Sequence, residues 1–411
     1  MPPESEVSGT DRSGAAEPGS PWVGRVDAWL LAALTVGLAA SITLSEFALA
    51  ILALWLTVTR RWPGVRGGGW PLAAPMTAFA AWTLVAAVAS ARPLESLVAA
   101  KSVLSLGAFY VVLNALPDRA AAHRFTAGLL LAFAAVGALA VVQAVGCPGP
   151  EATGLLFRKC LRARGLFSTY MTLAGTLTLV LVATLPPLTC AGRGAWWKWP
   201  AWIVGVLALG LTYVRGAWLG FAVGALMDTV GGRRRRLALA AVAVVVIAAV
   251  VTPGVVRRLG TIGDLADPTT RERLAMLSAG LAMAHDHPLT GVGPGQVKHL
   301  YPRYAPPEAV RRHTSHLHDT PLQILVERGL PGLAAWLAIF AAFIVRGLRA
   351  GRRAPGDRPE DRALVLGCVA ALVAFVVAGL FEYNFGDTEV LLVAAALMAV
   401  PLVIERDRRP S

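Results

Sequence analysis

Long apolar segments separated by short polar connections run through most of this chain, and this pattern predicts a protein that crosses a membrane many times. Several segments are short for a hydrocarbon layer of about 30 Å and need polar residues that reach the headgroups. Twelve such segments occur, at residues 27–43, 45–59, 70–90, 96–116, 124–146, 166–187, 199–214, 216–232, 237–252, 330–347, 363–381 and 388–404. The expected fold is therefore an all-α integral membrane protein with about twelve transmembrane helices.

One connection is much longer than the others. It covers residues 253–329, between nine predicted transmembrane helices in residues 27–252 and three more in residues 330–404. We expect it to be a large, partly helical loop. Residues 1–26 are rich in Ser, Gly, Glu and Pro and predict a disordered tail, and residues 405–411 predict a short second tail. The first tail lacks the layout of a cleaved signal peptide.

Composition supports a membrane protein and charge indicates how it is oriented. Hydrophobic residues make up 56% of the chain and charged residues 15%, against about 25% charged in soluble proteins. The net charge is +13, but the basic residues lie mainly in short connections, so we expect no nucleic-acid partner. With the N-terminus in the cytoplasm, twenty Lys and Arg residues fall in inner connections and the C-terminal tail, and six in short outer ones. This satisfies the positive-inside rule, so both tails are expected in the cytoplasm and residues 253–329 outside it.

The four cysteines form no recognisable metal or disulfide framework. Cys147 and Cys160 share one predicted outer connection. Outside the cytoplasm such a pair can be oxidised, so both a disulfide and two free thiols remain open.

The long loop contains a polar island that is rich in histidine. Six of the seven histidines lie in it: His285, His287, His299, His313, His316 and His318. Its first part, residues 270–284, predicts a helix, because three leucines recur at helical spacing. They are Leu274, Leu277 and Leu281. Arg271 and Arg273 fall in the first turn, where the helix dipole is positive, and a bound anion such as phosphate would relieve that conflict. The alternative is that Glu272 and Asp267 neutralise both arginines.

A second helix follows the last histidine. Thr320 is a suitable N-cap, Pro321 suits the first helical position, and Gln323 completes a capping box. We expect this helix to run to Arg328 and to end at Gly329. His318 then lies just outside a helix N-terminus, whose dipole keeps an imidazole neutral, as a general base must be. A histidine metal site and a polar loop without chemistry are the alternatives.

Two further stretches carry polar residues on the same side. Arg215 interrupts two apolar runs, which makes it a functional candidate, although lipid headgroups could also account for it. A cluster of four outer basic residues has the same two explanations: Arg158, Lys159, Arg162 and Arg164. Residues 382–389 supply carboxylate and amide groups that could orient sugar hydroxyls, pair with the arginines, or form a solvated turn.

At these residues the chain resembles the superfamily of O-antigen ligases and O-antigen polymerases, roughly over residues 160–400. His318 and Asp319, nine residues, and then glycines at 329 and 332 are similar to the ligase signature, with Asp319 where Asn, Ser or Gln is usual. Three shorter stretches are also similar to family segments: residues 214–218, Arg273 with residues 287–293, and residues 164–167.

The resemblance implies a bacterial inner-membrane glycosyltransferase with a periplasmic active face, which moves a glycan from a polyprenyl (undecaprenyl) diphosphate carrier to an acceptor hydroxyl. It implies a metal-independent, inverting reaction without a cofactor. His318 would be the base, and Arg215 and Arg273 would bind the diphosphate. We add as substrate-binding candidates Arg164, Arg271, Arg312, His316, Asp319 and Glu382.

The expected partners are the lipid-linked donor, a glycolipid or glycan acceptor and membrane lipids. Lipid A-core sugar is the favoured acceptor. A second lipid-linked repeat would make the protein a polymerase, and a protein hydroxyl would make it an O-oligosaccharyltransferase. A transporter of lipid-linked glycan is the alternative from another class, although we find no internal repeat of the kind that transporters carry. A metal-dependent membrane hydrolase is the third.

Overall fold

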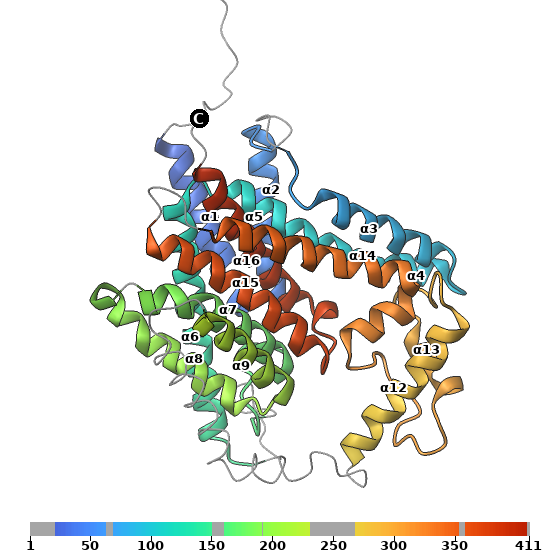
Figure 1. Ribbon diagram of the computed structural model, residues 1–411. Helices are drawn as coiled ribbons and strands as arrows, with labels where there is room; N and C mark the ends of the chain where they lie inside the picture. Colours follow the sequence, from blue (N-terminus) through green and yellow to red (C-terminus); the bar gives the residue numbers. More distant parts are fainter. Residues whose placement is uncertain are drawn as a thin grey trace, which may run out of the picture.

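The computed structural model describes residues 21–62, 69–149, 160–190, 192–230, 268–352 and 358–408, and every regular element in these ranges is a helix (Figure 1). Seven helical segments there are long and apolar enough to cross a membrane: residues 22–40, 93–115, 119–145, 170–190, 320–350, 359–379 and 388–407. An all-helical, multi-pass membrane protein is thereby confirmed. The total of twelve spans stays a prediction, because the expected span at 237–252 lies outside the described residues.

The N-terminal half of the bundle follows the predicted apolar segments closely. Its helices are α1 (Pro21–Ala40), α2 (Ile42–Val58), α3 (Ala73–Val88), α4 (Pro93–Ala100), the 3-10 helix η1 (Lys101–Gly107), α5 (Ala108–Ala115) and α6 (Arg119–Val145). The polar residues between apolar runs cap these helices: Ser41 accepts a hydrogen bond from the Leu44 amide, and Asp118 from the Ala121 amide. The expectation of a disordered tail up to residue 26 was wrong for residues 21–26, which belong to α1.

The C-terminal half contains the remaining helices. They are α7 (Tyr170–Cys190), the 3-10 helix η2 (Gly192–Lys198), α8 (Trp199–Leu211), α9 (Arg215–Val230), α12 (Pro268–Asp286), α13 (Val297–Tyr304), α14 (Thr320–Ala350), α15 (Pro359–Gly379), the 3-10 helix η3 (Asn384–Gly386) and α16 (Thr388–Asp407). The predicted span at 330–347 is the second part of α14, which is divided by a kink at Gly329.

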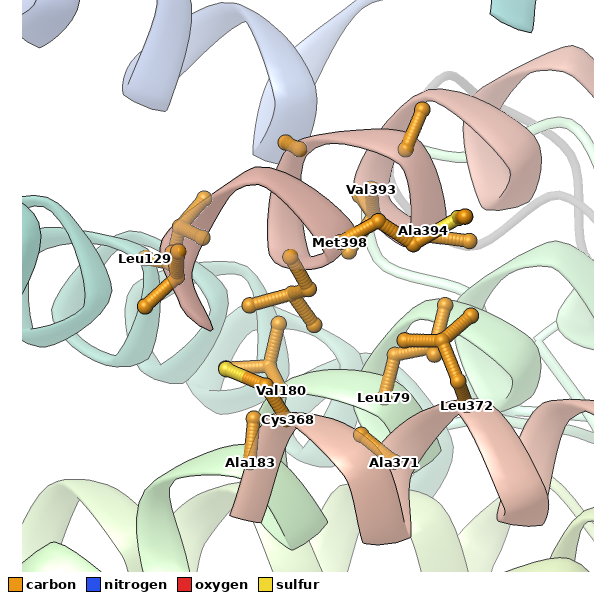
Figure 2. Packing of buried hydrophobic residues seen from close by; sticks show 14 of the residues in the cluster. Leu129, Leu179, Val180, Ala183, Cys368, Ala371, Leu372, Val393, Ala394 and Met398 are labelled. Carbon is orange, nitrogen blue, oxygen red and sulfur yellow. The ribbon is translucent and has the colours of Figure 1, made fainter. Parts of the chain in front are cut away.

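The centre of the bundle is formed by α7, α15 and α16. Figure 2 shows Val393, Ala394 and Met398 of α16 facing side chains of α7 and α15, with Leu129 of α6 beside them. Helix α16 is buried all around over residues 390–404, as expected of a helix without a polar face. Close approach of α15 to α7 depends on Gly367, because a Cβ there would overlap the carbonyl oxygen of Ala183.

Ion pairs and hydrogen bonds join the ends of neighbouring helices, and they show which helix ends lie together at each end of the bundle. At one end Arg119 lies 3.4 Å from Asp361, which links α6 to α15. At the other end the Thr172 hydroxyl donates to Asp387 at 2.6 Å, which links α7 to α16. The first set carries connections expected inside the cytoplasm and the second carries those expected outside. Which end faces the cytoplasm stays a prediction.

Helices α12 and α13 lie outside the bundle, beyond the outer ends of the spanning helices (Figure 1). They enclose a small apolar core of their own, formed mainly by Met276, Ala279, Met283, Val297, Tyr301, Leu317 and Leu322. The three leucines that predicted α12 are on its other face, with 47, 43 and 53% of their surface exposed at positions 274, 277 and 281. The helix was therefore predicted correctly from residues that do not pack in its core.

The question left open for the cysteines has an answer in the structure. Cys147 and Cys160 form a disulfide with their Cα atoms 5.4 Å apart. Three residues beyond Cys160, the Ala163 amide donates to the Leu211 carbonyl at the end of α8. The described residues that follow the disulfide are therefore bonded to the end of α8.

Candidate functional site

His318 and Glu382 form a side-chain pair at the outer end of the bundle. His318 Nδ1 lies 2.7 Å from Glu382 Oε1, and the two side chains are 23 and 16% exposed. The histidine immediately precedes α14 and the carboxylate follows α15, so the pair joins segments that are 64 residues apart. His318 has a φ of +52°, a left-handed conformation that is uncommon outside glycine and that often occurs at functional sites.

The start of α14 fixes both partners, although not through the predicted cap. Asp319, not Thr320, is the N-cap, and its carboxylate accepts a hydrogen bond from the Leu322 amide at 2.8 Å. The Thr320 hydroxyl instead donates to the Glu382 carbonyl at 2.8 Å. Gln323 does not complete a capping box, because its Oε1 accepts from the Leu317 amide. The capping box was therefore wrong, and Thr320 ties the two segments of the pair together.

The geometry of this hydrogen bond suits the predicted role of His318 as a general base. When Nδ1–H donates to the Glu382 carboxylate, Nε2 keeps its lone pair and can accept a proton. The carboxylate then stabilises the imidazolium that forms, as the carboxylate does in a hydrolase triad.

A second imidazole lies beside this pair. The rings of His316 and His318 have centroids 4.4 Å apart, and Ser315 Oγ lies 2.9 Å from His316 Nδ1. Burial lowers the pKa of His316 below its ordinary value, and the nearby His318 lowers it further. Both effects favour the neutral form of the His316 imidazole.

The first part of α14 ends where the sequence predicted. Gly329 has a φ of +65°, and a Cβ there would overlap the carbonyl oxygen of Leu289. Amides of the glycine-rich turn after α12 satisfy the carbonyls of this helix end, with Val292 N bonded to Val326 O at 2.8 Å. From the bundle, Trp82 Nε1 donates to the Arg328 carbonyl at 2.8 Å. The signature glycine thus allows the outer loop and the bundle to cap the helix that carries His318.

Glu327 and Arg328 form a buried ion pair that the sequence did not predict. Arg328 Nη1 lies 2.8 Å from Glu327 Oε2, and the side chains are 2 and 4% exposed. Arg328 Nε also donates to Thr83 Oγ1 of α3 at 3.1 Å, and Glu327 Oε1 accepts from the Gly295 amide at 2.8 Å. A charged dipeptide just before an apolar span is the only sequence signal for it.

A cavity of about 510 Å³ opens beside these residues. Its ionisable lining residues are His316, Glu327, Arg328, Glu382, Tyr383, Asp387 and Glu389. Hydroxyl and amide side chains complete its polar wall: Ser102, Ser168, Thr169, Thr172, Ser315, Asn384 and Thr388. The volume lies within the range of about 300 to 1,000 Å³ that is usual for small-molecule sites. Glu382 lines the cavity and is hydrogen-bonded to His318, so the cavity lies next to the candidate base.

A family model described as O-antigen ligase matches residues 200–337. Residues 200–337 are similar to the O-antigen ligase family. The match includes His318 and both glycines of the signature, and it confirms the resemblance that the motifs predicted. It supports a membrane glycosyltransferase of the ligase or polymerase type. No curated protein matches the chain.

The arginines that the resemblance assigns to the diphosphate lie on two other elements of this region. Arg215 is partly buried at the start of α9. The next residue, Gly216, lies so close to Phe381 that a Cβ would be 2.7 Å from that of the phenylalanine. The start of α9 therefore packs against the residue that precedes Glu382. Arg273 is exposed on α12. Neither lines the cavity described above, and their roles stay predictions.

The other substrate-binding candidates have different environments. Arg271 and Arg312 are exposed, and Arg312 donates to the Ala305 carbonyl at 3.2 Å. Arg164 is partly buried, with its Nε enclosed and without a hydrogen-bond partner. Asp319 is the N-cap described above, and burial raises its pKa. Arg158, Lys159 and Asp267 lie outside the described residues. Only His316 and Glu382 of this group are part of the site around His318.

Three side chains of the site offer atoms suitable for a metal ion. In the described part of the chain, His316, His318 and Glu382 form the group whose ligand atoms lie within 4.8 Å of one another. Two histidines and a carboxylate are a ligand set that zinc accepts. Metal binding would have to replace the hydrogen bond between His318 and Glu382. The expected metal independence of the reaction stays a prediction, with a direct test below.

Proposed function

We propose that this protein transfers a glycan from undecaprenyl diphosphate, or a related polyprenyl diphosphate, to an acceptor hydroxyl. Lipid A-core sugar is the acceptor we favour. The observation that carries the proposal is the His318–Glu382 pair beside a polar cavity at one end of a membrane bundle.

The reaction uses the imidazole as a base. His318 Nε2 takes the proton of the acceptor hydroxyl as its oxygen attacks the anomeric carbon of the donor sugar. The bond from that carbon to the diphosphate oxygen breaks, and the diphosphate leaves with the electron pair. Attack opposite to the leaving group inverts the anomeric configuration. Glu382 offsets the charge that His318 gains.

Arg215 and Arg273 bind the diphosphate in this mechanism and offset its growing charge. Guanidinium groups suit the task, because their planar forks meet phosphate oxygens in pairs and stay protonated. The packing of Gly216 against Phe381 supports a place for Arg215 near the catalytic pair. Tyr213, two residues earlier, has a φ of +56°, so this connection also adopts an uncommon conformation.

The proposed location is the bacterial inner membrane, with the site on the periplasmic side. The excess of basic residues in the connections assigned to the cytoplasm supports this orientation. The Cys147–Cys160 disulfide lies at the same end of the bundle as His318, and disulfides are typical of compartments outside the cytoplasm.

The direct test is a transfer assay with purified protein, undecaprenyl-diphosphate-linked glycan and EDTA. We expect elongated lipid A-core and released undecaprenyl diphosphate, at the same rate with and without the chelator. Product only with a second lipid-linked repeat, or only with a protein hydroxyl, would indicate a polymerase or an O-oligosaccharyltransferase. Donor that crosses the membrane of a vesicle without release of diphosphate would indicate a transporter. Loss of activity in EDTA that zinc restores would contradict the metal-independent mechanism.

Arg215→Ala and Arg273→Ala should each slow transfer by about a hundred- to a thousand-fold, the usual effect of removing a group that stabilises transition-state charge. Arg215→Lys should keep part of the rate, because it retains the charge and loses the fork. The matched control is Arg303→Ala, an exposed arginine on α13, which should transfer at the wild-type rate. Wild-type rates in both test variants would remove these arginines from the mechanism.

A further inference from the structure

The cavity beside His316 and Glu382 is lined by more acidic than basic side chains. Four of its lining side chains are carboxylic acids: Glu327, Glu382, Asp387 and Glu389. Arg328 is the one guanidinium among the described lining residues, and Glu327 already neutralises it at 2.8 Å. Glu389 is hydrogen-bonded to Asp387. Among the described lining residues, three carboxylic acids thus have no guanidinium partner in the wall: Glu382, Asp387 and Glu389.

A diphosphate is a poor ligand for such a wall. Like charges in a partly buried site repel one another strongly, because little water screens them. A sugar carries no such charge, and its hydroxyls donate hydrogen bonds that carboxylates accept well. The charge of the cavity therefore favours binding of the acceptor sugar over binding of the donor diphosphate.

We propose that this cavity is the acceptor subsite, that it holds an acceptor sugar by its hydroxyls, and that the donor diphosphate binds outside it, on the Arg215 side of His318. The inference rests on the proposed transferase function and adds to it which substrate occupies the cavity. Asp387, Glu389 and Thr172 are then the acceptor-binding residues.

The polar wall presents neighbouring hydroxyl and carboxylate groups that can form hydrogen bonds with the hydroxyls of a sugar. Thr172 Oγ1 donates to Asp387 Oδ2 at 2.6 Å, and Thr169 Oγ1 lies 2.9 Å from Thr172 Oγ1. These side chains come from α7 and α16, across the cavity wall from the α14 and α15 segments that carry His316 and Glu382. A sugar bound to Asp387 and Thr172 thus shares the cavity with Glu382, the hydrogen-bond partner of His318.

The test compares the KM for acceptor with the KM for donor in Asp387→Asn. Asparagine is as good an N-cap as aspartate, so α16 keeps its cap to Val390 while the charge is lost. We expect the KM for lipid A-core, or for whichever acceptor gives product in the transfer assay, to rise about 10- to 100-fold, as for a hydrogen bond to a charged group. The KM for undecaprenyl-diphosphate-linked glycan should stay within about twofold.

Thr172→Val is the second variant, because it removes a hydroxyl and keeps the shape of the side chain. We expect about a tenfold rise in acceptor KM alone, the size of one neutral hydrogen bond. Glu95→Gln is the matched control: this exposed carboxylate lies at the same end, bonded to His299, and does not line the cavity. Both of its KM values should equal those of wild type.

The outcomes separate this inference from the function on which it rests. A rise in donor KM with an unchanged acceptor KM in Asp387→Asn would overturn the assignment, as would unchanged values in both variants. Either result leaves transfer by His318 intact. Failure of the proposed function would be seen differently, as no product with any acceptor or as wild-type transfer by His318→Ala.

Discussion

The His318→Ala variant should transfer glycan at least about a hundred times more slowly than the wild type, because a positioned general base contributes roughly 10²- to 10⁴-fold. The structure suggests a second variant, for which we expect an intermediate rate. Glu382→Gln keeps a hydrogen-bond partner for Nδ1 but loses the charge that stabilises imidazolium, so its rate should lie between those of His318→Ala and wild type. Initial rates of product formation at saturating donor and acceptor measure both effects.

The control for this pair is His313→Ala. His313 lies in the same loop, is exposed, and is not part of the group around Glu382. It should transfer at the wild-type rate and bind donor normally. If His318→Ala and His313→Ala were equally active, the imidazole at 318 would not be the base, and the resemblance of its motif would not extend to its chemistry.

Much of the bundle was readable from the sequence, because a membrane imposes a simple rule on each span. An apolar segment of sufficient length must become a helix, since its backbone groups find no partner in lipid. The boundaries of α6 and α16 lie within a few residues of the predicted ones for this reason. The end of the first part of α14 was equally readable, because Gly329 is needed there for its positive φ.

The sequence predicted the position of His318 but not its hydrogen-bond partner. Its place before a helix N-terminus follows from local sequence, and the structure has it there. Its partner Glu382 was only a substrate-binding candidate, because pairing over 64 residues depends on how α14 and α15 pack. The wrong capping box has the same cause: locally Thr320 is a good cap, but the Glu382 carbonyl competes for its hydroxyl.

The burial of charged side chains was the feature that the sequence predicted least well. Sequence rules place Glu327 and Arg328 on a helix but cannot tell a solvated pair from an enclosed one, because enclosure comes from α3 and the glycine-rich turn. Asp387 likewise looked like part of a solvated turn until α7 supplied Thr172 as its donor. Polar residues that are enclosed by distant segments therefore have to be found in the structure.

Arg328→Met should destabilise the protein by about 3 to 5 kcal/mol, because it leaves the carboxylate of Glu327 buried without its cation. The measurement is thermal unfolding in detergent, with the midpoint and enthalpy compared between variants. Arg303→Met, an exposed arginine changed in the same way, should shift the free energy of unfolding by no more than about 0.5 kcal/mol. A variant with the midpoint of wild type would show that the pair is not enclosed as described.

A double variant separates charge from packing. Glu327→Gln removes the stranded carboxylate, and Gln can still accept from the Gly295 amide, so Glu327→Gln combined with Arg328→Met should be more stable than Arg328→Met alone. If the double variant were instead the less stable of the two, the Glu327 carboxylate would be stabilised by its hydrogen bonds from the Gly295 amide and Gln323 even without Arg328, and the unpaired charge would not be the cause of the damage. The recovery expected here follows from burial, because a lone charge in a dry site costs more than the loss of both partners.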